Sequence, residues 1–145
     1  MHELGIIVHV MRTVEEVAAE NNLTEIRSVT CEIGEVSGVV PEYMADCWGY
    51  ARSRSELLKD SELKIEIIPG VTMCEDCGKT YSTVQYAKIC PHCGSSATYL
   101  LEGNGFSIKE IEVILEFKRV SIYLFFTLHT TMKVDISDKT MRYRK

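Results

Sequence analysis

The chain has 145 residues and carries 16 Lys and Arg against 21 Asp and Glu, a formal net charge of −5. Its 46% share of apolar residues is ordinary for a folded protein and too high for a disordered one. The net acidity argues against a general nucleic-acid binder, which would carry a basic face, so we expect no nucleic-acid partner. No apolar run of about 18 residues occurs, and we expect no membrane span.

The amino-terminal stretch lacks the features of a secretory leader. No basic segment precedes its apolar residues, and His9 and Arg12 interrupt the apolar run. We therefore expect a cytoplasmic protein in a reducing compartment, where cysteines bind metals more often than they form disulfides.

Apolar periodicity predicts a helix over residues 4–20 and a strand over residues 25–36. At 100° per residue the apolar side chains of the helix fall in one sector, formed by Leu4, Ile7, Met11, Val14 and Ala18 and widened by Val8, Val10 and Val17. The strand segment alternates, which predicts a half-buried strand with an inner face of Val29, Cys31 and Ile33.

A second helix is predicted from Pro41, a residue that suits the first helical turn. Its apolar stripe consists of Met44, Cys47, Ala51 and Leu58, with Trp48 adjacent. Residues 62–68 alternate again and predict a second strand. Residues 106–117 predict a third strand, and the change of its apolar phase near Lys109 and Glu110 indicates a β-bulge or a strand end.

The carboxy-terminal residues 118–145 are a different kind of sequence. Residues 1–113 hold 9 basic and 18 acidic side chains, whereas residues 114–145 hold 7 basic and 3 acidic ones. A strand-like run, Val120–Leu128, is too apolar to stay exposed without promoting aggregation. Three interpretations remain open: an added strand or hairpin, a segment for association, or a non-native extension.

Four of the six cysteines form two CxxC pairs with twelve residues between them. Two residues between cysteines let one tight turn aim both sulfurs at one ion, and a glycine after each pair frees the backbone to curl around it. The pattern predicts a zinc site held by Cys74, Cys77, Cys90 and Cys93. Metal binding would supply folding energy to a segment with few large apolar residues.

The alternatives for these cysteines are a redox dithiol and an iron–sulfur site, and two symmetric CxxCG turns argue against both. A closed shell of four thiolates leaves no open position for catalysis, so we expect a structural or sensing metal. His92 lies between two of the cysteines and is expected to be an exposed turn residue. Cys31 and Cys47 are expected to be small buried hydrophobes with free thiols.

The amino terminus offers a second set of metal donors. The α-amine of Met1 and the amide of His2 close a five-membered chelate ring, and that amide closes a six-membered ring with Nδ1 of His2. The amides of His2 and Glu3 close a further five-membered ring. Ionised amide nitrogens in a plane suit Ni(II) or Cu(II), so Met1, His2 and Glu3 are candidate nickel ligands.

These features occur together in a recognisable order. MHE at the start, an amphipathic helix, CEIGEVSGVVPEYM, and then CEDCG and CPHCG jointly resemble the HypA/HybF family of nickel metallochaperones for [NiFe]-hydrogenase maturation. The resemblance covers about residues 1–113, and the stretch after it has no counterpart in the family.

The resemblance implies an α+β fold with a small mixed three-stranded sheet and two helices. The nickel-binding domain would span residues 1–69 and 100–117, with an inserted zinc-ribbon-like domain at 70–99 and an extension of unclear role at 118–145. His2 would bind transported Ni(II), and the four paired cysteines would hold structural Zn(II). Implied partners are a nickel-handling hydrogenase-maturation GTPase and the hydrogenase large subunit. The resemblance leaves open whether the chain forms a homodimer and whether it also delivers nickel to urease.

Two rival functions are weighed against this carrier. A zinc-ribbon adaptor would bind protein or nucleic acid, but residues 71–99 contain only Lys79 and Lys88 as basic side chains. An enzyme is poorly supported, because the chain has no phosphate-binding glycine loop, no nucleophile elbow and no HExxH motif. We therefore expect a metal carrier that is not an enzyme.

Overall fold

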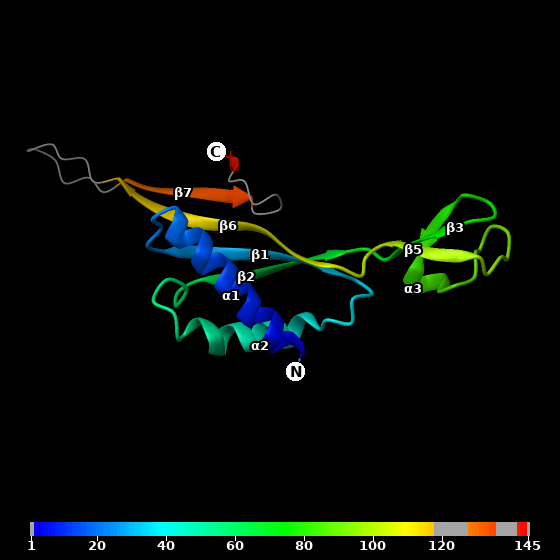
Figure 1. Ribbon diagram of the computed structural model, residues 1–145, viewed down its shortest axis with the longest axis horizontal. Coiled ribbons are helices and arrows are strands. Elements are labelled where there is room, and N and C mark those ends of the chain that lie inside the picture. The colour runs from blue at the N-terminus through cyan, green and yellow to red at the C-terminus, as the bar shows by residue number, and fades with distance from the viewer. Residues whose placement is uncertain (1, 118–127, 136–141, 145) are drawn as a thin grey trace, which may run out of the picture.

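The structure is a computed structural model that describes residues 2–117, 128–135 and 142–144. In this part of the chain the molecule is elongated and consists of two sheets (Figure 1). Helices α1 (His2–Glu20) and α2 (Pro41–Arg52) lie together on one side of the larger sheet. The smaller sheet projects from one end of the larger one and carries the short helix α3 (Thr83–Tyr86).

The larger sheet is built around β1 (Ile26–Gly34). β2 (Glu62–Ile68) pairs with it in parallel, and α2 provides the crossover that a parallel pair requires. β6 (Phe106–Phe117) pairs with β1 in the antiparallel sense on the other side. The mixed three-stranded sheet expected from the sequence is therefore present as β2-β1-β6.

A β-bulge at Lys109 explains the change of apolar phase in β6. Thr30 is opposite Glu110 and Cys31 is opposite Ile108, so Lys109 is the extra residue between them. Without this insertion Ile108 and Ile111 would point to opposite faces of the sheet, because side chains alternate. With it, both are buried in the core, 9% and 0% exposed.

The main core lies between the helices and the sheet. The inner face predicted for β1 is confirmed, since Val29, Cys31 and Ile33 are buried. The stripe predicted for α1 is partly wrong, because Leu4 is 41% exposed. The buried face of α1 is rotated toward Val10 and runs through Ile7, Val10, Val14 and Ala18.

Helix α2 contributes buried Met44, Trp48 and Ala51, as its stripe predicted, whereas Cys47 is half-buried. Leu58 is fully buried, but it reaches the core from the turn after the helix, which ends at Arg52. The backbone carbonyl of Ser61 anchors this turn by accepting hydrogen bonds from Trp48 Nε1 at 3.3 Å and Arg52 Nη1 at 2.6 Å.

The smaller sheet has strand order β4-β3-β5. Its strands are β3 (Val71–Cys74), β4 (Thr80–Ser82) and β5 (Thr98–Glu102). We refer to residues 71–102 as the small-sheet unit and to residues 2–68 with 106–117 as the main-sheet unit.

The carboxy-terminal stretch adds two strands to the larger sheet. β7 (Leu128–Asp135) pairs with β6, and β8 (Arg142–Arg144) pairs with β7, both antiparallel. Within the described residues the sheet thus has five strands rather than three. Apart from Leu128, where β7 begins, the strand-like run Val120–Leu128 lies outside the described residues.

A chain that ends at Phe117 tests this pairing. Without β7, the backbone amides on the outer edge of β6 lose their partners and should exchange hydrogen at least about tenfold faster, as local opening becomes easier. Amides of β2 should keep their exchange rates, because β1 separates β2 from the deletion. Hydrogen exchange followed by mass spectrometry provides the measurement, and equal β6 exchange in the full and shortened chains would contradict the pairing.

Candidate metal centre

The two CxxCG turns fold in the same way. Gly78 N–H donates to the Cys74 carbonyl at 3.0 Å, and Gly94 N–H donates to the Cys90 carbonyl at 2.8 Å. Gly78 and Gly94 have φ angles of +68° and +75°, a conformation that favours glycine. The freedom predicted for the glycine after each pair is therefore used in both turns, and each turn brings its two sulfurs to the same side.

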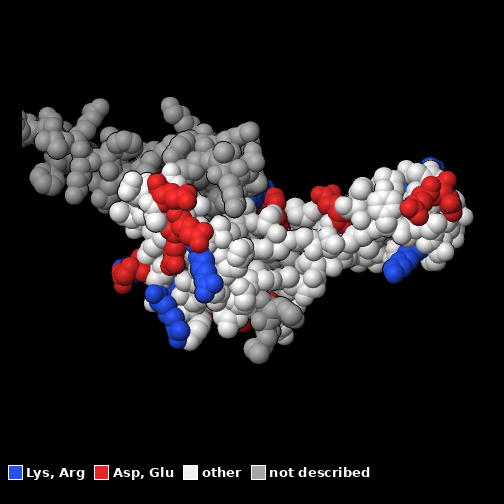
Figure 2. Space-filling model, viewed as in Figure 1, with Lys and Arg blue, Asp and Glu red and all other residues white. Residues whose placement is uncertain are grey.

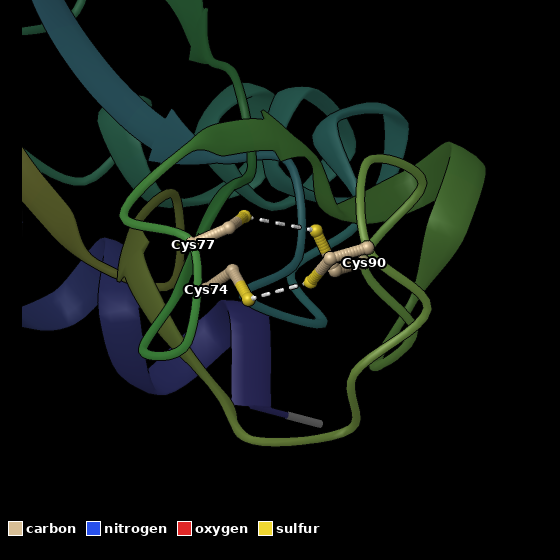
Figure 3. A group of neighbouring side chains, drawn as sticks. Cys74, Cys77 and Cys90 are labelled. Carbon is tan, nitrogen blue, oxygen red and sulfur yellow. Dashed lines mark hydrogen bonds between the residues drawn. The ribbon is translucent and has the colours of Figure 1, made fainter.

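The four sulfur atoms converge on one point (Figure 3). All lie within 4.8 Å of one another, and the Sγ atoms of Cys74 and Cys93 are 3.6 Å apart, as are those of Cys77 and Cys90. A disulfide would require about 2.05 Å, and all four cysteines are free. A tetrahedral ion with Zn–S bonds of about 2.3 Å would separate its sulfurs by about 3.8 Å. The donor set and its spacing therefore fit a zinc ion.

The electrostatics of the cluster favour a bound cation. Burial opposes ionisation of Cys90, but the backbone amides of His92 and Cys93 and the neighbouring thiols outweigh it and lower the pKa of Cys90 to about 7. At Cys93 the Ser95 amide favours the thiolate, yet burial and three neighbouring thiols raise the pKa to about 12. The neighbouring thiols thus oppose the formation of several thiolates together, and a bound cation would favour it.

Few buried side chains surround the cysteine cluster. Its buried core consists of Cys74, Cys90 and Tyr81, with Cys77 packed against them. His92 is exposed, and it is not among the side chains that converge on the cluster. Outside the cluster, Cys31 is fully buried, and this burial raises the pKa of its thiol to about 12.

The amino-terminal candidates lie apart from the cysteine cluster. Met1 and the side chain of His2 lie outside the described residues. Helix α1 begins at His2, and in Figure 1 its start lies beside α2, while the small-sheet unit occupies one end of the molecule. Backbone amides, first that of Glu3 itself and also that of Val40, lower the pKa of the Glu3 carboxyl. Glu3 thereby connects the start of α1 to the residue that precedes α2.

The sequence did not reveal a groove where the two sheets meet. It has a volume of about 460 Å³ and is lined by Glu32, Gly34, Ile68 and residues 101–107. Nothing in the sequence indicated that residues 68–70 and 103–105 lie together.

Residues 1–113 match the protein family described as "Hydrogenase/urease nickel incorporation, metallochaperone, hypA". The chain belongs to the HypA family. Among its relatives are hydrogenase maturation factors HypA of Geobacter metallireducens, 36% identical, and of Rhodopseudomonas palustris strain BisA53, 34% identical. Each alignment spans 113 residues, 78% of this chain and 99% of the relative.

Solved structures of the family share the fold. The solution structure of a HypA protein aligns with a TM-score of 0.61 and 25% identity, covering 78% of this chain and 96% of that one. The nickel metallochaperone HypA from Helicobacter pylori aligns with a TM-score of 0.58 and 23% identity, covering 77% and 96%. The family consists of maturation factors and metallochaperones rather than catalysts. Among the described residues, no helix is both long and apolar enough to cross a bilayer.

Replacing one clustered cysteine tests the metal centre. Cys74→Ser leaves three sulfurs around the point of convergence, so we expect metal retention to fall at least about tenfold. Hydrogen exchange of the small-sheet unit should rise, while β1 amides stay protected. Metal analysis of the purified protein and hydrogen exchange measure both effects.

Cys47→Ser is the matched control, because this half-buried thiol lies on α2 outside the cluster. It should retain the metal content of the unaltered chain. Equal metal content in the Cys74 and Cys47 variants would contradict a four-cysteine site.

Proposed function

We propose that this chain is a nickel carrier that binds Ni(II) at its amino terminus and delivers it for [NiFe]-hydrogenase maturation. The observation that carries the proposal is the family match over residues 1–113, which includes the terminal Met1-His2-Glu3 donors. Ni(II) is the cargo, and the chemistry is ligand exchange: the terminus releases the ion to a partner that offers better donors.

The position of these donors at a helix start supports nickel binding. The first four N–H groups of a helix have no carbonyl partner within it. The amides of His2 and Glu3 therefore take no part in the backbone hydrogen bonds of α1. The helix dipole also favours negative charge there, which helps an amide nitrogen to bind a metal in its ionised form. The Glu3 carboxylate now accepts a hydrogen bond from its own amide, and a metal on that nitrogen would replace this bond.

In this proposal Cys74, Cys77, Cys90 and Cys93 hold a structural Zn(II). A closed four-thiolate shell offers no open coordination position, so the ion would supply cross-linking rather than catalysis. The short strands of the small-sheet unit and its core of three buried residues support this role. The proposed division is a nickel domain at 1–69 and 100–117, a zinc domain at 70–99, and an extension at 118–145.

The proposed partners are proteins. A nickel-handling GTPase and the hydrogenase large subunit, both in the cytoplasm, would receive or relay the ion. In Figure 2 the visible face of the small-sheet unit carries an acidic group at its tip and few basic side chains, with uncharged surface between them. Among its exposed large apolar side chains are Val84, Tyr86, Ile89, Tyr99 and Leu101. Such a surface favours a protein partner over a nucleic acid, which would require positive charge.

Calorimetric titration with Ni(II) tests the proposal on tag-free, zinc-loaded protein with its native terminus. We expect about one Ni(II) per chain, and at least about tenfold weaker binding for His2→Ala, because the imidazole and the six-membered ring that it closes are lost. Zinc content should be unchanged. A dipeptide added before Met1 should weaken binding similarly, since it moves the α-amine out of the chelate.

His9→Ala is the matched control, since His9 is an exposed histidine two turns further along α1. It should bind nickel as the unaltered chain does. If His2→Ala and His9→Ala bind equally well, the terminus is not the nickel site, and the small-sheet unit becomes the part of the chain for which a protein partner should be sought.

A further inference from the structure

Three segments meet where the small-sheet unit joins the main-sheet unit. The chain enters the unit through residues 68–70 and leaves it through residues 103–105. Between these two connections lie residues 34–36, which are the last residue of β1 and the start of the turn after it. Gly34 N–H donates to the Gly105 carbonyl at 2.8 Å, and Val36 N–H donates to the Gly103 carbonyl at 2.9 Å. On the other side, Glu35 N–H donates to the Ile68 carbonyl at 2.8 Å. A third segment thus cross-links the two covalent connections.

Three glycines pack backbone against backbone at this junction. A Cβ on Gly34 would lie 2.2 Å from the carbonyl oxygen of Gly103, and a Cβ on Gly103 would lie 2.5 Å from Cα of Gly70. Gly103 also has a φ of +99°, which side-chain-bearing residues rarely adopt. Real Cβ atoms do not approach backbone atoms so closely, so these contacts exist only because Gly34 and Gly103 lack side chains. Such contacts leave little room for the connections to shift.

Glu35 holds the entering connection at two points. Its amide donates to Ile68, and its carboxylate Oε2 accepts a hydrogen bond from Gly70 N–H at 2.8 Å. Ile68 and Gly70 flank Pro69, so Glu35, the residue directly after β1, holds the chain on both sides of the proline. Gly70 in turn accepts from Thr83 N–H at 2.9 Å, at the start of α3, and the hydroxyls of Thr83 and Thr72 are 2.8 Å apart. The hydrogen bonds therefore continue from β1 into the small-sheet unit.

We propose that Glu35 is a positioning residue that holds the small-sheet unit at a fixed orientation to the main-sheet unit. A hydrogen bond to a carboxylate is stronger than one between neutral groups. Here the carboxylate of Glu35 holds the entering connection, residues 68–70, which contains Pro69. The two units then tumble as one body. A partner would meet the cysteine-bearing surface and the start of α1 together, and this last consequence rests on the proposed nickel function.

NMR relaxation and amide exchange on the zinc-loaded, full-length protein test the proposal. In the unaltered chain, both units should share one overall tumbling time, and the Gly70 amide should be protected from exchange. Glu35→Ala should raise Gly70 exchange about tenfold and make the small-sheet unit reorient faster than α1 and α2. Glu35→Gln, whose amide oxygen can still accept from Gly70, should keep the tumbling time and raise exchange less than about threefold.

Glu16→Ala is the control, because it removes an exposed carboxylate from α1 without touching the junction. Independent tumbling of the two units in the unaltered chain would overturn the proposal, as would unchanged Gly70 exchange and tumbling in Glu35→Ala. If Glu35→Ala does not fold, Gly70 exchange in Glu35→Gln decides the outcome: a rise above the unaltered chain supports the role of the carboxylate, and unchanged exchange overturns it. Nickel titration of Glu35→Ala should match the unaltered chain, so loss of nickel binding by His2→Ala and loss of orientation by Glu35→Ala are separate results.

Discussion

The pairing of β1 on both of its sides is the constraint on which the rest of the structure depends. β2 runs parallel to it and β6 runs antiparallel. Because of these directions, the end of β2 and the start of β6 reach the same end of the sheet as the end of β1. Whatever chain lies between β2 and β6 must therefore project from that end. The small-sheet unit occupies this position, and the end of β1 is available there to hold both of its connections.

Much of the main-sheet unit follows from periodicity, because its elements are long enough to show a pattern. The residues of β1 that alternation predicts to be buried are buried. The change of apolar phase in β6 corresponds to a β-bulge at Lys109. The rotation of α1 toward Val10 could not be predicted, since its apolar residues span a wider arc than the core covers. Leu58 was placed in the core correctly, but the helix expected to carry it ends earlier, at Arg52.

The small-sheet unit was predictable in its chemistry but not in its secondary structure. The spacing of the cysteines indicated a shared metal, and the four sulfurs do converge. Strands of three to five residues are too short to show alternation, and they are fixed by the two cysteine turns rather than by apolar burial. The junction was missed because its essential contacts are between glycines, which carry no side-chain pattern. Glu35 acts there through a backbone amide that is 35 positions away in the sequence.

The burial of Cys31 has a consequence for metal selectivity. A thiolate, not a thiol, captures a soft metal ion, and a carrier with loose thiolates would lose its cargo to them. Burial raises the pKa of Cys31 to about 12, so its thiol stays protonated at neutral pH. The core of the main-sheet unit thus contains a cysteine whose thiol is buried and held in its neutral form. The cysteines whose sulfurs converge lie instead in the cluster at the other end of the molecule.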